Sequence, residues 1–262
     1  MQDVISRSSF QLSKGACPSG LLPTGSTLFC DFDGPIADVS NRYYNTYQLA
    51  LAATQVDYTA QGLSLPLRRL TKGQFWYMKQ NRLPDTTIAD WSGLSGSQIE
   101  AFLAHVDRLV NCSSLLDQDL LQPGVRSALA TLQDRQIRVV IVTLRQASQV
   151  LDFLHQYGLA TAICQIYGPD SAEIAYANRT QHKIGQLRAA ISDQSLLGVD
   201  TTHSWMIGDT EADVCAGQAV GLPTLALTCG IRSSIYLKGF APTGVQRDLE
   251  NAVRYLTAPI QD

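Results

Sequence analysis

Two carboxylates stand two residues apart where an apolar run of the chain ends. The run 28–30 is followed directly by Asp31 and Asp33, and Gly34 comes next. Such a run predicts a buried strand, and α/β proteins bind ligands at the carboxyl ends of parallel strands. Two acids at that place offer a nucleophile and a proton donor beside room for a metal ion. Because Asp-x-Asp-Gly is also a common solvated turn, this chemistry depends on partners elsewhere in the chain.

Further polar groups follow later in the chain, each at the end of a predicted strand or helix. Thr143 ends a β-branched run, and Lys183 stands near the start of a predicted helix. Asp209 follows the apolar run 204–207, and Asp213 comes four residues later, on the same side of the helical turn that begins there. Each signal alone has an ordinary structural explanation, as a turn, a cap or a solvated residue. Their order along the chain favours one shared site.

The stretches between these residues alternate short apolar runs with amphipathic segments. Apolar and β-branched runs predict strands, whereas apolar residues at helical spacing predict helices. This alternation implies a parallel sheet with right-handed crossovers, so the sequence predicts a doubly wound α/β core. We expect strands over 28–30, 137–142, 162–167, 204–207 and 223–227, and helices opening at 123–124 and covering 146–157, 180–191, 211–220 and 246–256.

One long segment does not follow this alternation. Between Gly34 and Gln122 no strong strand pattern is present, whereas helical patterns run through 43–53, 71–81 and 97–111. Structureless connections of that length are uncommon in compact domains, so we expect a helical insertion that covers the carboxyl ends of the strands as a lid. We therefore divide the chain into a loosely ordered N-terminal arm (1–25), an α/β core (26–36 and 122–262) and a helical cap domain (37–121).

Composition restricts the class of protein. The 262 residues are 45% hydrophobic and 16% charged, and the formal net charge of −3 gives no basic footprint for nucleic acid. No apolar stretch approaches the roughly 20 residues of a membrane span, and residues 1–25 lack the pattern of a signal peptide. The six cysteines form no Cys-x-x-Cys pair and the four histidines are isolated. We therefore expect a cytoplasmic protein with reduced thiols, without zinc and without nucleic-acid or membrane partners.

In this order, the four signals resemble the four motifs of the haloacid dehalogenase-like (HAD) superfamily of hydrolases. The insertion after the first motif resembles that superfamily's helical cap, and the resemblance extends from Leu28 to Leu227. It implies a Rossmann-like core and a hydrolase of the phosphoglycolate phosphatase-like type. Two positions depart from the pattern. Pro35 stands where the phosphatases usually have threonine or valine, and Lys183 lacks the Lys-Pro-x-Pro context of the phosphoglycolate phosphatase and β-phosphoglucomutase branches.

The resemblance implies different roles for the first two acids. Asp31 would attack phosphorus and form an aspartyl-phosphate, which divides hydrolysis into two steps. Asp33 would protonate the leaving alcohol and then act as the base that activates water. In the family the backbone carbonyl at the position of Asp33 is the metal ligand, which leaves the carboxylate free for proton transfer.

The same resemblance implies a magnesium site. Asp209 would be the second metal carboxylate beside Asp31, and Asp213 would support the metal shell or orient the lysine. Crowded with a phosphate dianion, these acids would repel one another strongly without a cation. An oxygen-only site with few protein ligands suits Mg²⁺, which keeps several waters and bridges to phosphate.

Phosphate would be bound by groups at the other two motifs. The Thr143 hydroxyl and the Leu144 backbone N–H would contact the phosphoryl oxygens at a strand end. Lys183 would cancel negative charge on the nucleophile and the phosphate in the transition state. His182 is an alternative phosphate contact, and Arg145 is either a substrate contact or a solvated surface residue.

Substrate choice would belong to the cap. Tyr43 and Tyr47 lie four residues apart and share a helix face, as do the residues of a second predicted helix at i, i+3, i+4 and i+7 spacing. Both faces could instead be packing seams within the cap, with lysines that extend towards solvent. The candidate contacts are Arg42, Tyr43, Tyr47, Lys72, Phe75, Trp76 and Lys79.

The function predicted from these residues is hydrolysis of a small phosphorylated metabolite by a Mg²⁺-dependent phosphatase, as a monomer or homodimer. The second acid argues for fast turnover, because P-type ATPases have threonine at the position of Asp33 and preserve the aspartyl-phosphate. Two alternatives stay open. One is a phosphomutase acting on a sugar phosphate, and the other is a non-enzymatic sensor or binding module on the same fold.

Overall fold

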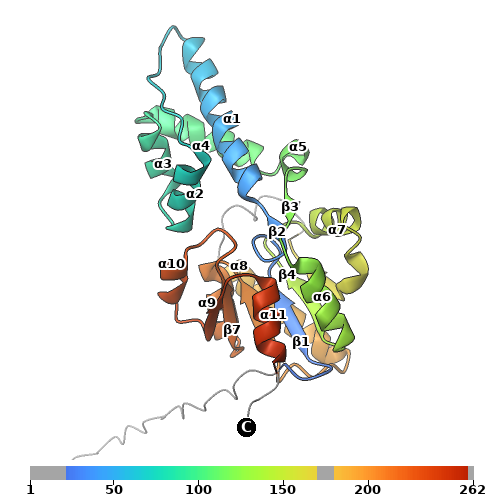
Figure 1. The fold of residues 1–262 in the computed structure, drawn as a ribbon. Coiled ribbons are helices and arrows are strands. Elements are labelled where there is room, and N and C mark those ends of the chain that lie inside the picture. Colours follow the sequence, from blue (N-terminus) through green and yellow to red (C-terminus); the bar gives the residue numbers. More distant parts are fainter. Residues whose placement is uncertain (1–21, 170–179, 259–262) are drawn as a thin grey trace, which may run out of the picture.

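The computed structural model describes residues 22–169 and 180–258, so residues 1–21 of the expected N-terminal arm, with Cys17, lie outside the described residues. Within them, six strands form the core sheet: β1 (Thr27–Cys30), β4 (Arg138–Val142), β5 (Gln165–Tyr167), β6 (Trp205–Gly208), β7 (Thr224–Leu227) and β8 (Gly244–Gln246). All pair in parallel, in the order β5-β4-β1-β6-β7-β8. This arrangement confirms the doubly wound α/β core predicted from the sequence (Figure 1).

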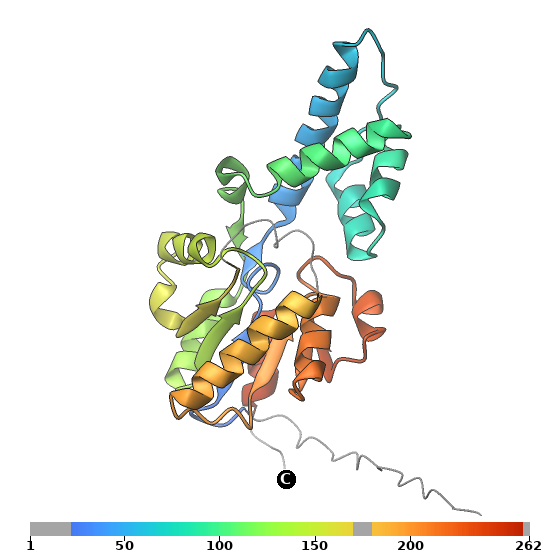
Figure 2. The same ribbon diagram turned by 180° about the vertical axis from the view of Figure 1, so that it is seen from behind.

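Helices cover both faces of the sheet, because its strands are apolar on both sides. Successive side chains of a strand point to opposite faces. Leu28 and Cys30 of β1 therefore pack on one face, and Phe29 packs on the other. The first face is covered by α6 (Val125–Asp134), α7 (Ala147–Gln156) and α11 (Leu249–Thr257), and the second by α8 (Thr180–Leu196) and α9 (Glu211–Ala219) (Figures 1 and 2).

The cap is a separate group of helices beyond one end of the core, as both views show. It contains α1 (Ser40–Thr59), α2 (Lys72–Gln80), α3 (Asp85–Trp91) and α4 (Ser97–Leu109), and α5 (Ser113–Leu116) leads back towards the core. These helices enclose their own hydrophobic cluster, which includes Tyr47, Phe75 and Phe102. Among the described residues, no helix combines the length and apolar character needed to cross a membrane.

Two chain crossings join the core to the cap. The outgoing crossing contains β2 (Ala37–Asp38) and the returning one contains β3 (Leu120–Leu121), and the two pair in antiparallel fashion. Gln122 follows β3, and its Nε2 donates to the carbonyl oxygen of Gly34 at 2.9 Å. The outgoing and returning chains are therefore tied to each other next to the first acidic motif.

Several elements differ from the sequence prediction. Helix α1 is 20 residues long, whereas the apolar pattern predicts only 43–53. Its buried face carries Arg42, Thr46 and Thr54 beside its apolar residues, so the apolar pattern from which a helix is recognised is interrupted. The helix expected from 246 begins at Leu249, where the Asp248 carboxylate accepts from the Asn251 N–H. Strand β8, helix α3, helix α5 and the short α10 (Ser234–Lys238) carry too few residues to show a period.

The Tyr47 hydroxyl is a polar group inside the cap. Its side chain is buried, with its ring stacked on Phe75 at 5.1 Å between centroids. The hydroxyl accepts from the Leu70 N–H at 2.9 Å and shares a hydrogen bond with the Ser92 hydroxyl at 2.9 Å. Loss of this oxygen would leave a buried N–H without its acceptor.

We expect Tyr47→Phe to lower the free energy of unfolding by about 1–3 kcal/mol, the usual cost of a buried unsatisfied donor. Urea denaturation followed by circular dichroism measures this change. Tyr58→Phe is the matched control, because the Tyr58 hydroxyl bonds Ser97 at an exposed position. Equal stability of the two variants would contradict a structural role for the Tyr47 hydroxyl.

Candidate active site

Three neighbouring strands deliver the first polar groups of the site. Asp31 follows β1, Thr143 follows β4 and Asp209 follows β6, and β1 lies between the other two in the sheet. The Asp31 N–H donates to the Ile207 carbonyl and the Thr143 N–H to the Tyr167 carbonyl, both at 2.8 Å. These bonds extend the parallel ladders by one residue, so the side chains leave the sheet from fixed backbone positions.

Three carboxylates gather at this edge. One ligand oxygen from each of Asp31, Asp209 and Asp213 lies within 4.8 Å of the others, and all three residues are buried. Asp213 reaches the group from the first turn of α9, where its Oδ2 accepts from the N–H and the hydroxyl of Thr210. Gly208 permits this approach, because a Cβ at that position would overlap the Asp213 carboxylate.

Lys183 supplies the positive charge beside these acids. It lies in the first turn of α8 and is only 1% exposed. Its Nζ lies 2.7 Å from Asp31 Oδ1 and 2.8 Å from Asp213 Oδ1. Burial alone would lower the pKa of Lys183, but Asp213 and Asp31 outweigh it and raise the pKa. The lysine is therefore a fixed cation.

The negative charge of the carboxylates still exceeds the positive charge of Lys183. Three of them face one ammonium, which leaves an excess of two negative charges. Burial, with the nearby Asp213, raises the pKa of Asp31 to about 7, and burial with Asp31 raises the pKa of Asp209 well above its usual range. Asp209 Oδ2 accepts from the Ile231 N–H at 2.6 Å, whereas its buried Oδ1 has no hydrogen-bond partner among the described residues.

These observations fit a divalent cation with oxygen ligands. The excess charge matches a doubly charged ion, the orphaned Asp209 oxygen offers it a ligand, and all donors are carboxylates, which suits Mg²⁺. Two glycines, Gly34 and Gly230, lie against Asp209, where a Cβ would overlap its carboxylate. Gly34 also has φ +95°, a backbone region that favours glycine.

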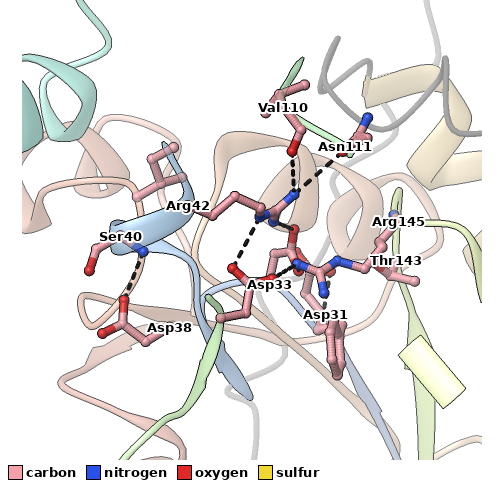
Figure 3. Close-up of polar contacts among 12 residues, drawn as sticks. Asp31, Asp33, Asp38, Ser40, Arg42, Val110, Asn111, Thr143 and Arg145 are labelled. Atoms are coloured by element: carbon pink, nitrogen blue, oxygen red, sulfur yellow. Dashed lines mark hydrogen bonds and ion pairs between the residues drawn. The ribbon is translucent and has the colours of Figure 1, made fainter. Parts of the chain in front are cut away.

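The Asp33 carboxylate points elsewhere, towards two arginines (Figure 3). Arg42 donates to its Oδ2 at 2.8 Å and Arg145 lies 2.9 Å from its Oδ1. Burial would raise the pKa of Asp33, but Arg145 and Arg42 together hold that pKa below its usual range. Arg145 is 3% exposed, so it is not the solvated surface residue that the sequence left open.

A pocket of about 90 Å³ opens between these groups and the cap. Most of the predicted site residues line it, namely Asp31, Asp33, Thr143, Leu144, Lys183 and Asp209. Thr143 also anchors the loop that follows, because its hydroxyl accepts from the Arg145 N–H at 3.0 Å. The cap contributes Tyr43, Lys79, Arg82 and Asp85 to the lining, and the loop after β7 contributes Ile231 and Arg232.

The other cap candidates and His182 do not line this pocket. Tyr47 lies in the hydrophobic cluster of the cap, and Trp76 packs against both the cap cluster and the core cluster. Lys72 is exposed, with its Nζ 2.6 Å from the Asn41 side-chain oxygen. His182 is exposed on α8. For Tyr47, Trp76 and Phe75, packing within the cap explains the spacing.

A polar contact between the cap and the core was not predicted from the sequence. Glu211 binds Arg232 at 2.8 Å and Arg82 at 3.0 Å, and Arg232 also donates to the Lys79 carbonyl oxygen. The Ser233 N–H donates to the Gln80 carbonyl at 2.8 Å. The end of α2 therefore rests on the loop after β7. No pattern of residue spacing in the sequence identifies this loop, because its contacts with α2 form only when the cap is folded against the core.

The fold and its motifs are similar to those of known proteins. The family model described as haloacid dehalogenase-like hydrolase matches residues 28–227. A pyrophosphatase, PpaX, from Oceanobacillus iheyensis is 27% identical over 50% of this chain and 58% of its own length. A phosphoglycolate phosphatase from Rhodospirillum rubrum is 29% identical over 51% of this chain and 50% of its own. The chain thus spans about half the length of the curated relatives it matches.

Solved structures share the fold at lower sequence identity. A haloacid dehalogenase-like family hydrolase from Streptococcus pneumoniae superposes with a TM-score of 0.62. The similarity covers 88% of this chain and 97% of that one, at 19% identity. The aligned region includes the cap as well as the core, because the cap contains more residues than the part of this chain left unaligned.

We expect Gly230→Ala to weaken Mg²⁺ binding by about 10-fold or more, because the new methyl group displaces the Asp209 carboxylate from its position and supporting residues matter to that extent in metal sites. Isothermal titration calorimetry with Mg²⁺ alone measures the affinity. Gly73→Ala in α2 is the control, since a Cβ there meets no atom within 4 Å. Unchanged affinity in Gly230→Ala would exclude Asp209 as a ligand.

Proposed function

We propose, since this chain belongs to the haloacid dehalogenase-like hydrolase family, that it is a Mg²⁺-dependent phosphatase that acts on a small phosphorylated metabolite through an aspartyl-phosphate. The observation that carries this proposal is Lys183 held between Asp31 and Asp213, next to the orphaned oxygen of Asp209, at the floor of a small pocket. A carboxylate that is paired on one side and faces a pocket on the other suits nucleophilic attack.

In the first step, Asp31 attacks phosphorus and the bond from phosphorus to the leaving oxygen breaks. Asp31 Oδ1 is engaged by Lys183 and by the Phe32 N–H at 2.7 Å, which leaves Oδ2 for the attack. Thr143 and the Leu144 N–H hold the phosphoryl oxygens, while Lys183 offsets the charge that builds up on them. The product of this step is an aspartyl-phosphate and an alkoxide that requires a proton.

Asp33 moves the protons of both steps. It gives a proton to the leaving oxygen and later takes one from the water that attacks the aspartyl-phosphate, which restores Asp31 and releases phosphate. Its two arginines keep it ionised in the free protein, since they lower its pKa. A phosphate ester beside it adds negative charge and raises that pKa, so the proton is taken up together with the substrate.

The metal site completes this arrangement. Asp31, Asp209 and the backbone carbonyl of Asp33 would hold Mg²⁺, with Asp213 in support, and the ion would supply a counter-charge to the nucleophile and the phosphate. Asp213 has a second task, which is to fix Lys183 in line with Asp31.

The size and charge of the pocket support a small anionic substrate. Its volume of about 90 Å³ is well below that of pockets for drug-sized ligands. Lys79, Arg82 and Arg232 line it, with Lys79 paired to Asp85 and the two arginines sharing Glu211. The names of the two curated relatives make phosphoglycolate and pyrophosphate the first compounds to test. The formal net charge of −3 supports the absence of nucleic-acid partners, and the proposal includes a cytoplasmic location and a monomer or homodimer.

The test is phosphate release from a panel of phosphorylated metabolites with Mg²⁺, and product analysis by NMR separates hydrolysis from isomer formation. We expect phosphate release to saturate with Mg²⁺ and to be inhibited by Ca²⁺, because Ca²⁺ prefers longer bonds and more ligands.

Asp31→Asn should reduce kcat by about 10³-fold or more, as loss of a catalytic nucleophile does. Asp38→Asn is the control, since the amide oxygen can still accept from the Ser40 N–H. Retained activity in Asp31→Asn would exclude Asp31 as the nucleophile.

A further inference from the structure

Four charged residues form a closed ring beside the pocket, in which Arg42, Asp119 and Arg145 are buried and Asp33 is partly exposed (Figure 3 labels three of the four). Asp33 binds Arg42 through Oδ2 and Arg145 through Oδ1. Asp119 closes the ring, with its Oδ1 3.1 Å from Arg42 Nε and its Oδ2 bound to Arg145. Two carboxylates face two guanidinium groups, so the charges of the ring balance.

The ring connects Asp33 to both crossings between core and cap. Arg42 lies in the first turn of α1, just after the outgoing crossing, and Asp119 lies directly before β3 on the returning one. Arg42 also donates to the Val110 carbonyl at 3.5 Å and the Asn111 side-chain oxygen at 3.4 Å, between α4 and α5 (Figure 3). The orientation of one carboxylate in the core is thus set by Arg42 from the cap together with Arg145 from the core.

Asp119 does not line the pocket and its side chain is fully buried. Moving a carboxylate out of water costs several kcal/mol, and only well-placed partners offset that cost. Its partners are the two guanidinium groups that in turn bind Asp33. Because each Asp119 oxygen accepts from a different arginine, an amide in its place could serve only one of them.

We infer that Arg42, Asp119 and Arg145 are positioning residues that hold the Asp33 carboxylate in line with the leaving oxygen. The inference rests on the proposed phosphatase reaction, in which Asp33 gives that oxygen its proton. The hydrogen bond from Arg42 to Oδ2 and the ion pair of Arg145 with Oδ1 hold the two oxygens of Asp33, and Asp119 keeps the two arginines at the required separation. Displacement of a catalytic group by about 1 Å costs on the order of 100-fold in rate.

The test uses leaving groups that need a proton to different extents. Phenyl phosphate releases a basic phenolate and depends on a general acid, whereas dinitrophenyl phosphate releases a stable anion without one. In Asp119→Asn we expect kcat/KM to fall by about 10-fold or more for phenyl phosphate and by less than about 2-fold for dinitrophenyl phosphate, within the range that general acids contribute. A purely structural loss would lower both equally.

A double-variant comparison shows through which residue Asp119 acts. If it acts through Asp33, Asp33→Asn with Asp119→Asn should be no slower on phenyl phosphate than Asp33→Asn alone. Arg42→Lys keeps the charge but loses the planar fork, so the same selective loss is expected even if Asp119→Asn does not fold. Arg138→Lys is the matched control, because Arg138 binds Gln194 at the opposite end of β4.

Equal losses on the two esters, or additive losses in the double variant, would overturn the positioning role while leaving the proposed function intact. Phosphate release by the wild-type protein is the separate measure of that function. A wild-type protein inactive on both esters and on the metabolite panel would overturn the proposed function, and this inference with it.

Discussion

The repulsion among three buried carboxylates is the constraint on which this structure depends. Asp31, Asp209 and Asp213 lie within 4.8 Å of one another, where charges in a protein interior interact strongly. Lys183 offsets part of that repulsion from the start of α8, and the rest calls for a divalent cation. Glycines at 34, 208 and 230 provide the space that lets the acids come this close. In the proposed reaction, Asp31 can accept an anionic substrate only when these counter-charges are in place.

The sheet order explains why these residues meet. Since β1 lies between β4 and β6, residues after three sequence-distant strands emerge side by side at one edge. That consequence follows from strand pattern and crossover handedness, so the positions of Asp31, Thr143 and Asp209 could be predicted from the sequence. The position of Lys183 could be predicted for a similar reason, because α8 follows β5 and begins at the same edge of the sheet.

The cap and its contacts could not be predicted in the same way. Polar residues on the buried face of helix α1 interrupt its apolar pattern, and β2 and β3 have two residues each. Asp119 stands in a connecting segment with no motif around it, and its partners lie 77 and 26 residues away in sequence. Arg42 resembled a substrate contact, whereas it binds Asp33 and Asp119. Long-range ion pairs of this kind leave no local period.

Chemical trapping of the covalent intermediate tests most directly whether Asp31 is the nucleophile. Protein with Mg²⁺ and a substrate identified from the panel is quenched in acid during turnover and reduced with borohydride, which converts an aspartyl-phosphate to homoserine. Mass spectrometry of the peptides then locates the change. If Asp31 is the nucleophile, homoserine appears at position 31 and only when both substrate and Mg²⁺ are present. Homoserine at another position, or phosphate release with Asp31 never modified, would contradict it.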